Sequence, residues 1–177
     1  MSLLWTRTMI AATAASWALV VAAKSPAEWQ ALTAPLQVSM EQAVQAATQL
    51  VPGQVLEVEL DSGDRGKGVR YEAEVLGADG QRSEVWVDGV SGQALVHKRE
   101  SYTKAKDVQR AKSAQLDIAA AVQAATAHTA GKAVGVELDS HRDTTIYKVK
   151  VLQADHTVMK LKLDAVSGQV LEHKRDD

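Results

Sequence analysis

The chain of 177 residues is 46% hydrophobic and 24% charged, and its formal net charge at pH 7 is -2. This composition is ordinary for a globular protein and excludes a disordered acidic or basic tail protein. The balanced charge provides no overall field that would attract nucleic acid. Because the sequence has no cysteine, it excludes disulfides, zinc–thiolate sites and thiol catalysis.

The first 23 residues differ from the rest of the chain. Arg7 precedes an apolar run from Met9 to Ala23, and small residues stand where a signal peptidase would require them, before Lys24. This run of about 15 residues is shorter than the roughly 20 needed to span a bilayer. We expect a cleavable signal peptide, export to the periplasm and no membrane attachment after cleavage. The alternative is a membrane anchor that is never cut.

An internal repeat dominates the remaining sequence. The segment Ala43 to Thr48 recurs 78 residues later, and the segment Asp88 to Gln93 recurs 76 residues later with one change. Agreement in two separate segments indicates a duplicated module. The expected organisation is a signal peptide 1–23, an N-terminal extension 24–37, a first module 38–100, a partly helical linker 101–115 and a second module 116–177.

Each module is expected to begin with an amphipathic helix. Apolar residues recur at helical spacing from Met40 to Val51, directly after a capping box formed by Ser39 and Gln42. The second module repeats this pattern after Asp117, which is a favourable N-cap residue.

Strands with alternating polarity follow each helix. In the first module, runs 56–60, 71–75 and 84–88 alternate apolar and polar residues, and Asp79-Gly80 marks a hairpin turn. A short fourth strand is expected to end near His97. The sequence therefore predicts an α+β fold of two tandem modules, each with one helix packed on a three- to four-stranded antiparallel sheet.

The strand and turn sequences of both modules resemble the PepSY domain. In the first module these are the segments 55–60, 71–75 and 87–95. The resemblance implies a non-catalytic domain that occurs in propeptides of secreted metallopeptidases and in cell-envelope proteins, where it has an inhibitory or binding role. Two tandem copies behind a signal peptide are also similar to the lanthanide-binding PepSY proteins called lanpepsy.

Carboxylates gather on one face of the first predicted sheet. Strand alternation places Glu57, Glu59 and Asp61 on the same solvent face as acidic residues of the next two strands. Like charges that face each other across strands are destabilising, so this patch favours a cation. Oxygen ligands suit Ca²⁺ and lanthanide ions, and we expect no organic cofactor. The candidate metal ligands are Glu57, Glu59, Asp61, Asp64, Glu72, Glu74, Glu84, Asp139 and Asp143.

Two other interpretations of the same carboxylates stay open. A charged outer face is usual for a half-solvated antiparallel sheet. In the second module the corresponding face is basic, with Lys148, Lys150, Lys160 and Lys162. The opposite charges of the two faces predict attraction within one chain or self-association between chains.

The sequence predicts no enzyme. It contains no nucleophile elbow, metallopeptidase helix or phosphate-binding glycine loop. The first functional hypothesis is a periplasmic protein that binds lanthanide or calcium ions. The alternative is a protein-binding module that inhibits or chaperones a secreted peptidase, and Trp86, on the acidic face, is a candidate contact residue for such a partner. A third class is a purely structural envelope component.

Overall fold

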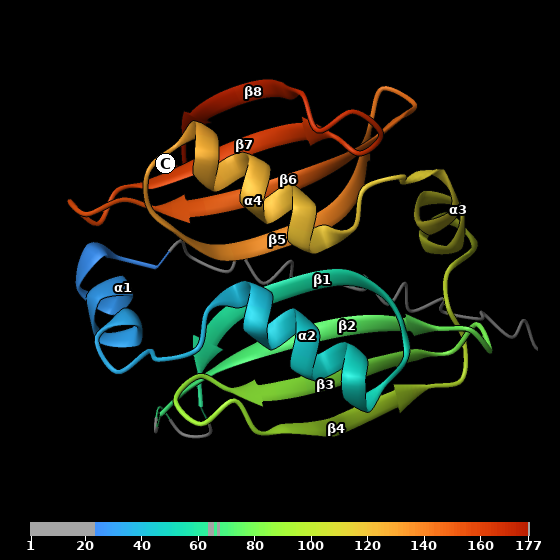
Figure 1. The fold of residues 1–177 in the computed structure, drawn as a ribbon, viewed down its shortest axis with the longest axis horizontal. Coiled ribbons are helices and arrows are strands. Elements are labelled where there is room, and N and C mark those ends of the chain that lie inside the picture. The colour runs from blue at the N-terminus through green and yellow to red at the C-terminus, as the bar shows by residue number, and fades with distance from the viewer. Residues whose placement is uncertain (1–23, 64–65, 67, 177) are drawn as a thin grey trace, which may run out of the picture.

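The computed structural model describes residues 24–63, 66 and 68–176, and the predicted signal peptide lies outside this part of the chain. Helices and strands of the two modules follow each other in the same order (Figure 1). None of the described helices is long and apolar enough to cross a membrane. The helices are α1 (Pro26–Thr33), α2 (Met40–Leu50), α3 (Ala105–Ser113) and α4 (Ile118–His128). The strands are β1 (Gly53–Ser62), β2 (Val69–Gly77), β3 (Arg82–Asp88), β4 (Ala94–Glu100), β5 (Lys132–His141), β6 (Thr144–Leu152), β7 (Val158–Asp164) and β8 (Val170–Arg175).

All eight strands belong to one antiparallel sheet in the order β4-β3-β2-β1-β5-β6-β7-β8. Each module contributes a four-stranded meander, so the predicted α+β fold of two helix-plus-sheet modules is confirmed. The sequence did not predict that β1 and β5 pair and join the two meanders. Because of this pairing, the faces of the two modules are continuous.

The seam between the modules is short and nearly symmetric. Strands β1 and β5 pair over three positions, and Val58 stands opposite Val136, its own equivalent in the repeat. A pseudo-two-fold axis therefore passes through this pair. The surrounding pairs break the symmetry, because Glu57 faces Glu137 whereas Glu59 faces Gly135.

Helices α2 and α4 both cover the same face of the sheet (Figure 1). The Ser39 hydroxyl accepts a hydrogen bond from the backbone N–H of Gln42, and the Gln42 side-chain carbonyl accepts one from the backbone N–H of Ser39. These two bonds confirm the predicted capping box. At the start of α4, the Asp117 carboxylate accepts a hydrogen bond from the backbone N–H of Ala120. Satisfied N-terminal amides fix where each helix begins above its sheet.

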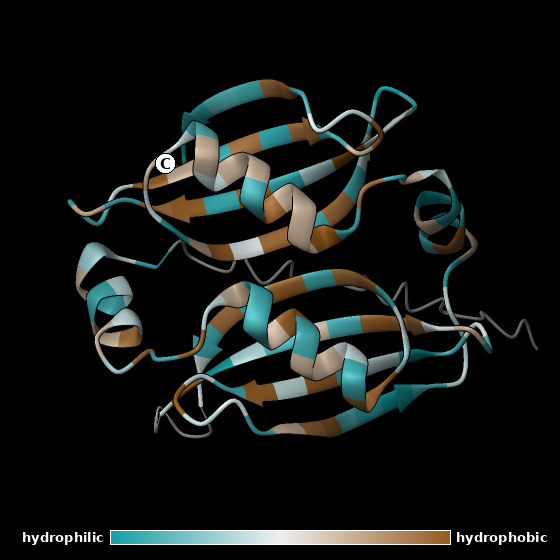
Figure 2. Ribbon diagram, in the orientation of Figure 1, coloured by the Kyte–Doolittle hydropathy of each residue, from teal (hydrophilic) through white to brown (hydrophobic). Residues whose placement is uncertain are grey.

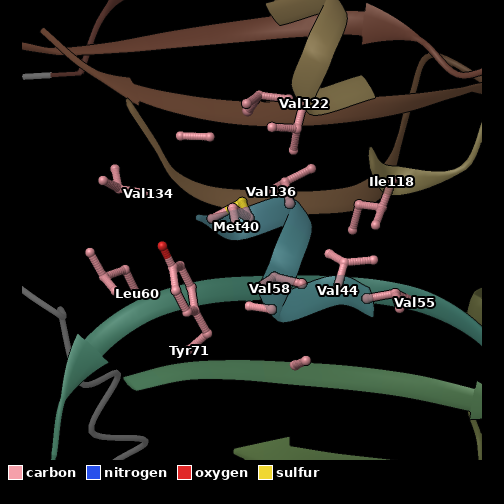
Figure 3. Packing of buried hydrophobic residues seen from close by; sticks show 14 of the residues in the cluster. Met40, Val44, Val55, Val58, Leu60, Tyr71, Ile118, Val122, Val134 and Val136 are labelled. Atoms are coloured by element: carbon pink, nitrogen blue, oxygen red, sulfur yellow. The ribbon is translucent and has the colours of Figure 1, made fainter. Parts of the chain in front are cut away.

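The core is one hydrophobic cluster that runs across the seam. Close to the seam, Met40 and Val44 of α2, Val58 of β1, Val122 of α4 and Val136 of β5 are all buried in it (Figure 3). Strand residues alternate between this core and the opposite side of the sheet, as the alternating hydropathy of the strands shows (Figure 2). The two modules therefore share one core and we expect them to unfold together.

A buried tyrosine ties each module to the segment before its helix. Tyr71 donates a hydrogen bond to the Val38 carbonyl at 2.8 Å, and Tyr147 donates one to the Leu116 carbonyl at 2.7 Å. Burial, and secondarily the charge of Asp117, raises the pKa of Tyr147 to about 12. The Tyr147 hydroxyl therefore stays protonated at neutral pH and can donate this hydrogen bond.

The face of the sheet opposite α2 and α4 is called the open face below. Its side chains come from alternate residues of the strands, such as Glu57 and Glu59 of β1 and Lys148 and Lys150 of β6. Helix α3, within the predicted linker, reaches one end of this face, where Arg110 pairs with Asp139 of β5 at 2.6 Å. The open face holds most of the predicted site residues.

Candidate functional site

A row of four carboxylates crosses the seam on the open face. The strand register places Glu84 opposite Glu74, Glu74 opposite Glu57, and Glu57 opposite Glu137. The first three residues were predicted as ligands from alternation, whereas Glu137 was expected on the outer face of the second module but was not among the candidate ligands. Its equivalence to Glu59 in the repeat was the available signal, but only the β1–β5 pairing brings it to this row.

Glu57 lies at the centre of the row and lacks an ion-pair partner among the described residues. Burial, followed by the charges of Glu74, Glu137 and Glu59, raises its pKa to about 7, although Lys150 acts in the opposite direction. Near neutral pH, a large fraction of Glu57 therefore carries a proton. Burial also raises the pKa of Glu74, against the opposing charge of Arg82.

Most of the other predicted ligands of the first module already have cationic partners. Arg70 pairs with Glu72 at 2.7 Å, and Arg82 bridges Glu74 at 2.9 Å and Glu100 at 2.8 Å. The remaining contacts are Asp61 with Lys24 at 3.4 Å, Glu59 with Lys150 at 3.2 Å, and Glu84 with the Trp86 indole N–H at 2.6 Å. These pairs compensate much of the charge that the sequence pattern left unbalanced.

The predicted ligands of the second module do not join the row. Asp139 pairs with Arg110 and with Lys148. Burial opposes its ionisation, but the hydrogen bonds from Lys148 and the Ser140 amide keep the pKa of Asp139 below its usual value. Asp143 lies in the exposed turn after β5, with a positive φ of 67°.

Asp64 lies outside the described residues. Within residues 24–63, 66 and 68–176, no three acidic or histidine side chains form a group that could hold a metal ion. The carboxylate row is therefore a line of neighbours across strands and not a closed ligand cage.

The basic side of the open face begins directly beyond the seam. Lys150 reaches across it to Glu59, and its stem passes over Gly135, where an added Cβ would stand 3.3 Å from the Lys150 Cδ. The expected attraction between acidic and basic residues is thus found as an ion pair within one sheet. The two halves lie side by side, so they do not face each other within a chain.

Two cavities flank the seam on the open face. One of about 290 Å³ lies between the carboxylate row and α3, where Arg82, Lys104 and Arg110 face Glu57 and Glu137. The other, of about 420 Å³, lies over Gly135. Its lining is Glu57, Val58, Glu59, Gly135, Val136, Glu137, Lys148, Lys150, Lys160, Lys162 and Lys174.

An aromatic stack stands on the acidic half. The Trp86 ring is stacked on His97 with 3.5 Å between ring centroids, and the Arg70 guanidinium carbon lies 3.6 Å from the Trp86 centroid. Leu95, opposite Trp86 in the register, is 53% exposed. The sequence indicated that Trp86 points outward, but the stack depends on the pairing of β2, β3 and β4. Together these residues form a fixed, partly apolar feature on a charged face.

Comparison with known proteins gives one family and one solved structure. The family model described as "Peptidase propeptide and YPEB domain", or PepSY, matches residues 37–95 and 115–174. A crystal structure of a "putative lipoprotein" from Clostridium difficile 630 is similar at 16% sequence identity and a TM-score of 0.45, over 80% of this chain and 95% of that chain. No curated protein matches the chain.

Proposed function

The chain belongs to the PepSY family of peptidase propeptide and YPEB domains, and from this premise we propose that it is an exported, non-catalytic protein that binds a secreted peptidase through its open face. A propeptide-like module acts by occupying a surface of its enzyme. In this chain, two such modules merge into one sheet. The continuous open face is the observation that carries the proposal.

The open face has the dimensions of a protein interface. Eight strands spaced by about 4.8 Å span about 34 Å, and strands of about seven residues extend roughly 20 Å, on the order of 700 Å² in area. A standard interface buries about 800 Å² on each partner. The segregated charges would favour specificity and fast association, and Trp86 with exposed Leu95 offers an apolar anchor.

The proposal is tested by adding the mature chain to the secreted peptidases of the organism that produces it and measuring hydrolysis of labelled casein. We expect inhibition that follows the concentration of the chain and is lost when Leu95 is changed to Glu. The matched control is Leu50→Glu, because Leu50 is a similarly exposed leucine at the end of α2. Unchanged hydrolysis at a saturating concentration would contradict the proposed function.

Binding of a calcium or lanthanide ion is the second candidate function, and the observation that favours it is the row Glu74, Glu57 and Glu137. A hard cation there would relieve the repulsion between carboxylates, which together with burial, the larger cause, raises the pKa of Glu57. Changes of side-chain rotamer would have to bring the three carboxylates together. The exported location and the carboxylate ligands are compatible with either ion.

For this second candidate we predict that Ca²⁺ or La³⁺ releases measurable heat in calorimetry of the metal-stripped mature protein. Glu57→Gln should abolish the heat, since it removes the central carboxylate. Glu72→Gln is the matched control, because Glu72 is already paired with Arg70. Equal heats from the two variants, or no heat from the parent, would argue against a metal site at the row.

A further inference from the structure

The basic half of the open face is built from five lysines on three adjacent strands. Lys148 and Lys150 lie on β6, Lys160 and Lys162 on β7, and Lys174 on β8. All five line the cavity of about 420 Å³ over Gly135. These five residues are called the lysine face below.

The register places like charges directly opposite each other on the lysine face. Lys148 faces Lys162, and Lys150 faces Lys160, which in turn faces Lys174. Such pairs destabilise a sheet. The acids that pair with these lysines lie around them on β1, β5 and β8 and after β8, and none lies on the open face of β6 or β7.

The fold itself does not require these lysines. The first module has the same meander and the same buried tyrosine, but its equivalents of the four lysines on β6 and β7 are Glu72, Glu74, Glu84 and Trp86. The core positions between them stay apolar in both modules. The lysine face is therefore an added surface feature of the second module.

We propose that the lysine face binds a short acidic segment of a partner protein, which lies along β6 and β7 with its carboxylates toward the lysine ammonium groups. This inference rests on the proposed function and names the chemistry of the partner. Charge complementarity selects carboxylate side chains, because lysine ammonium groups pair with them at any orientation. The cavity of about 420 Å³ beside these lysines provides the depression in which the segment would lie. Gly135 contributes no side chain to this cavity, and the Lys150 stem passes over it.

The size and surroundings of the lysine face limit the length of its ligand. The lysine face is about 10 Å wide across its three strands and about 7 Å long between alternate residues of one strand. Three or four acidic residues would cover this area. On the side nearest the seam, Glu57 and Glu59 of β1 and Glu137 of β5 line the same cavity. They would repel a long polyanion or an anionic membrane, both of which would extend across them.

The test is fluorescence anisotropy of a labelled peptide with four consecutive glutamates, added to the full mature chain at physiological ionic strength. The triple variant Lys160→Gln, Lys162→Gln and Lys174→Gln should weaken binding at least about tenfold. The matched control removes the same charge elsewhere, through the exposed residues Lys112, Lys132 and Arg142, each changed to Gln. It should bind as the parent does. Equal losses in the two variants would overturn the proposal.

Other occupants give different outcomes in the same series. Binding to vesicles of equal parts phosphatidylcholine and phosphatidylglycerol without binding to the peptide would overturn the proposal, as would self-association that the triple variant abolishes. In the unmutated chain, peptide binding must weaken from low to high salt, whether or not the triple variant folds. Salt-independent binding would also overturn it.

The two proposals fail separately. A triple variant that loses the peptide but still inhibits the peptidase would overturn the role of the lysine face in partner binding and leave the proposed function intact. A parent chain that binds the peptide but inhibits no peptidase would contradict the proposed function alone.

Discussion

Replacing Tyr147 with alanine is expected to lower the free energy of unfolding by about 3–5 kcal/mol, as is typical when a large buried aromatic side chain is removed. The Tyr147 ring is fully buried beneath α4, and its hydroxyl satisfies the Leu116 carbonyl. Alanine would leave both a cavity and an unpaired carbonyl. Urea unfolding followed by circular dichroism measures the change.

Two comparisons separate the contributions at Tyr147. Tyr147→Phe keeps the ring and should cost about 1–2 kcal/mol, since only the hydrogen bond to the carbonyl is lost. Tyr71→Ala removes the equivalent ring of the first module and should destabilise the chain by a similar amount. Because the modules share one core, each variant should unfold in a single transition. Two separate transitions would show that the seam does not couple the modules.

The second large effect concerns Glu57 at the seam. Its pKa rises from 4.5 to about 7 on folding, so between these pH values the folded chain binds more protons than the unfolded chain. Stability must then fall as the pH rises through this window. From pH 5 to pH 8 the parent should lose about 2 kcal/mol of unfolding free energy through this group.

Glu57→Gln should remove this pH dependence, because glutamine has no proton to lose. Glu72→Gln should keep it, since Glu72 is paired with Arg70. Any contribution of the histidines is common to the parent and both variants, and therefore cancels in the comparison. Unfolding by urea at both pH values gives the result. A parent and a Glu57→Gln variant with equal slopes against pH would refute the raised pKa of Glu57.

The module itself follows from local sequence patterns. Helical spacing after Ser39 and Asp117 placed α2 and α4 correctly, and alternation placed the first three strands. The fourth strand, expected to end near His97, extends to Glu100. These patterns report which side of an element is buried, and burial dominates the folding of a small module. The duplication then transferred the same assignment to the second module.

The seam does not follow from those patterns. Backbone hydrogen bonds join β1 to β5 at only three positions, and backbone groups are the same in every sequence. The two modules could equally have remained separate units joined by the linker. Helix α3 was likewise expected only as partial helix in a linker, because its single buried residue, Ala111, gives almost no apolar stripe.

The candidate site was predicted in part. Alternation placed the acidic residues of β1, β2 and β3 on one face, but the pairing of Arg82 with Glu74 and of Arg70 with Glu72 depends on rotamers that alternation does not encode. Compensation by these arginines leaves Glu57 without an ion-pair partner among the described residues, while Glu84 contacts the Trp86 indole N–H. The sequence showed that the first half is acidic and the second half is basic. It did not show that both halves share one surface.

The most direct test of a partner-binding open face is acetylation footprinting of lysines in the chain mixed with a secreted peptidase whose activity the chain is proposed to inhibit. Mass spectrometry then reports the reactivity of each lysine with and without the peptidase. We predict protection of Lys148, Lys150, Lys160 and Lys162, while Lys112 and Lys132, which do not line the open-face cavities, react as in the free chain. Protection of Lys112 or Lys132 with unchanged reactivity on the lysine face would contradict this account.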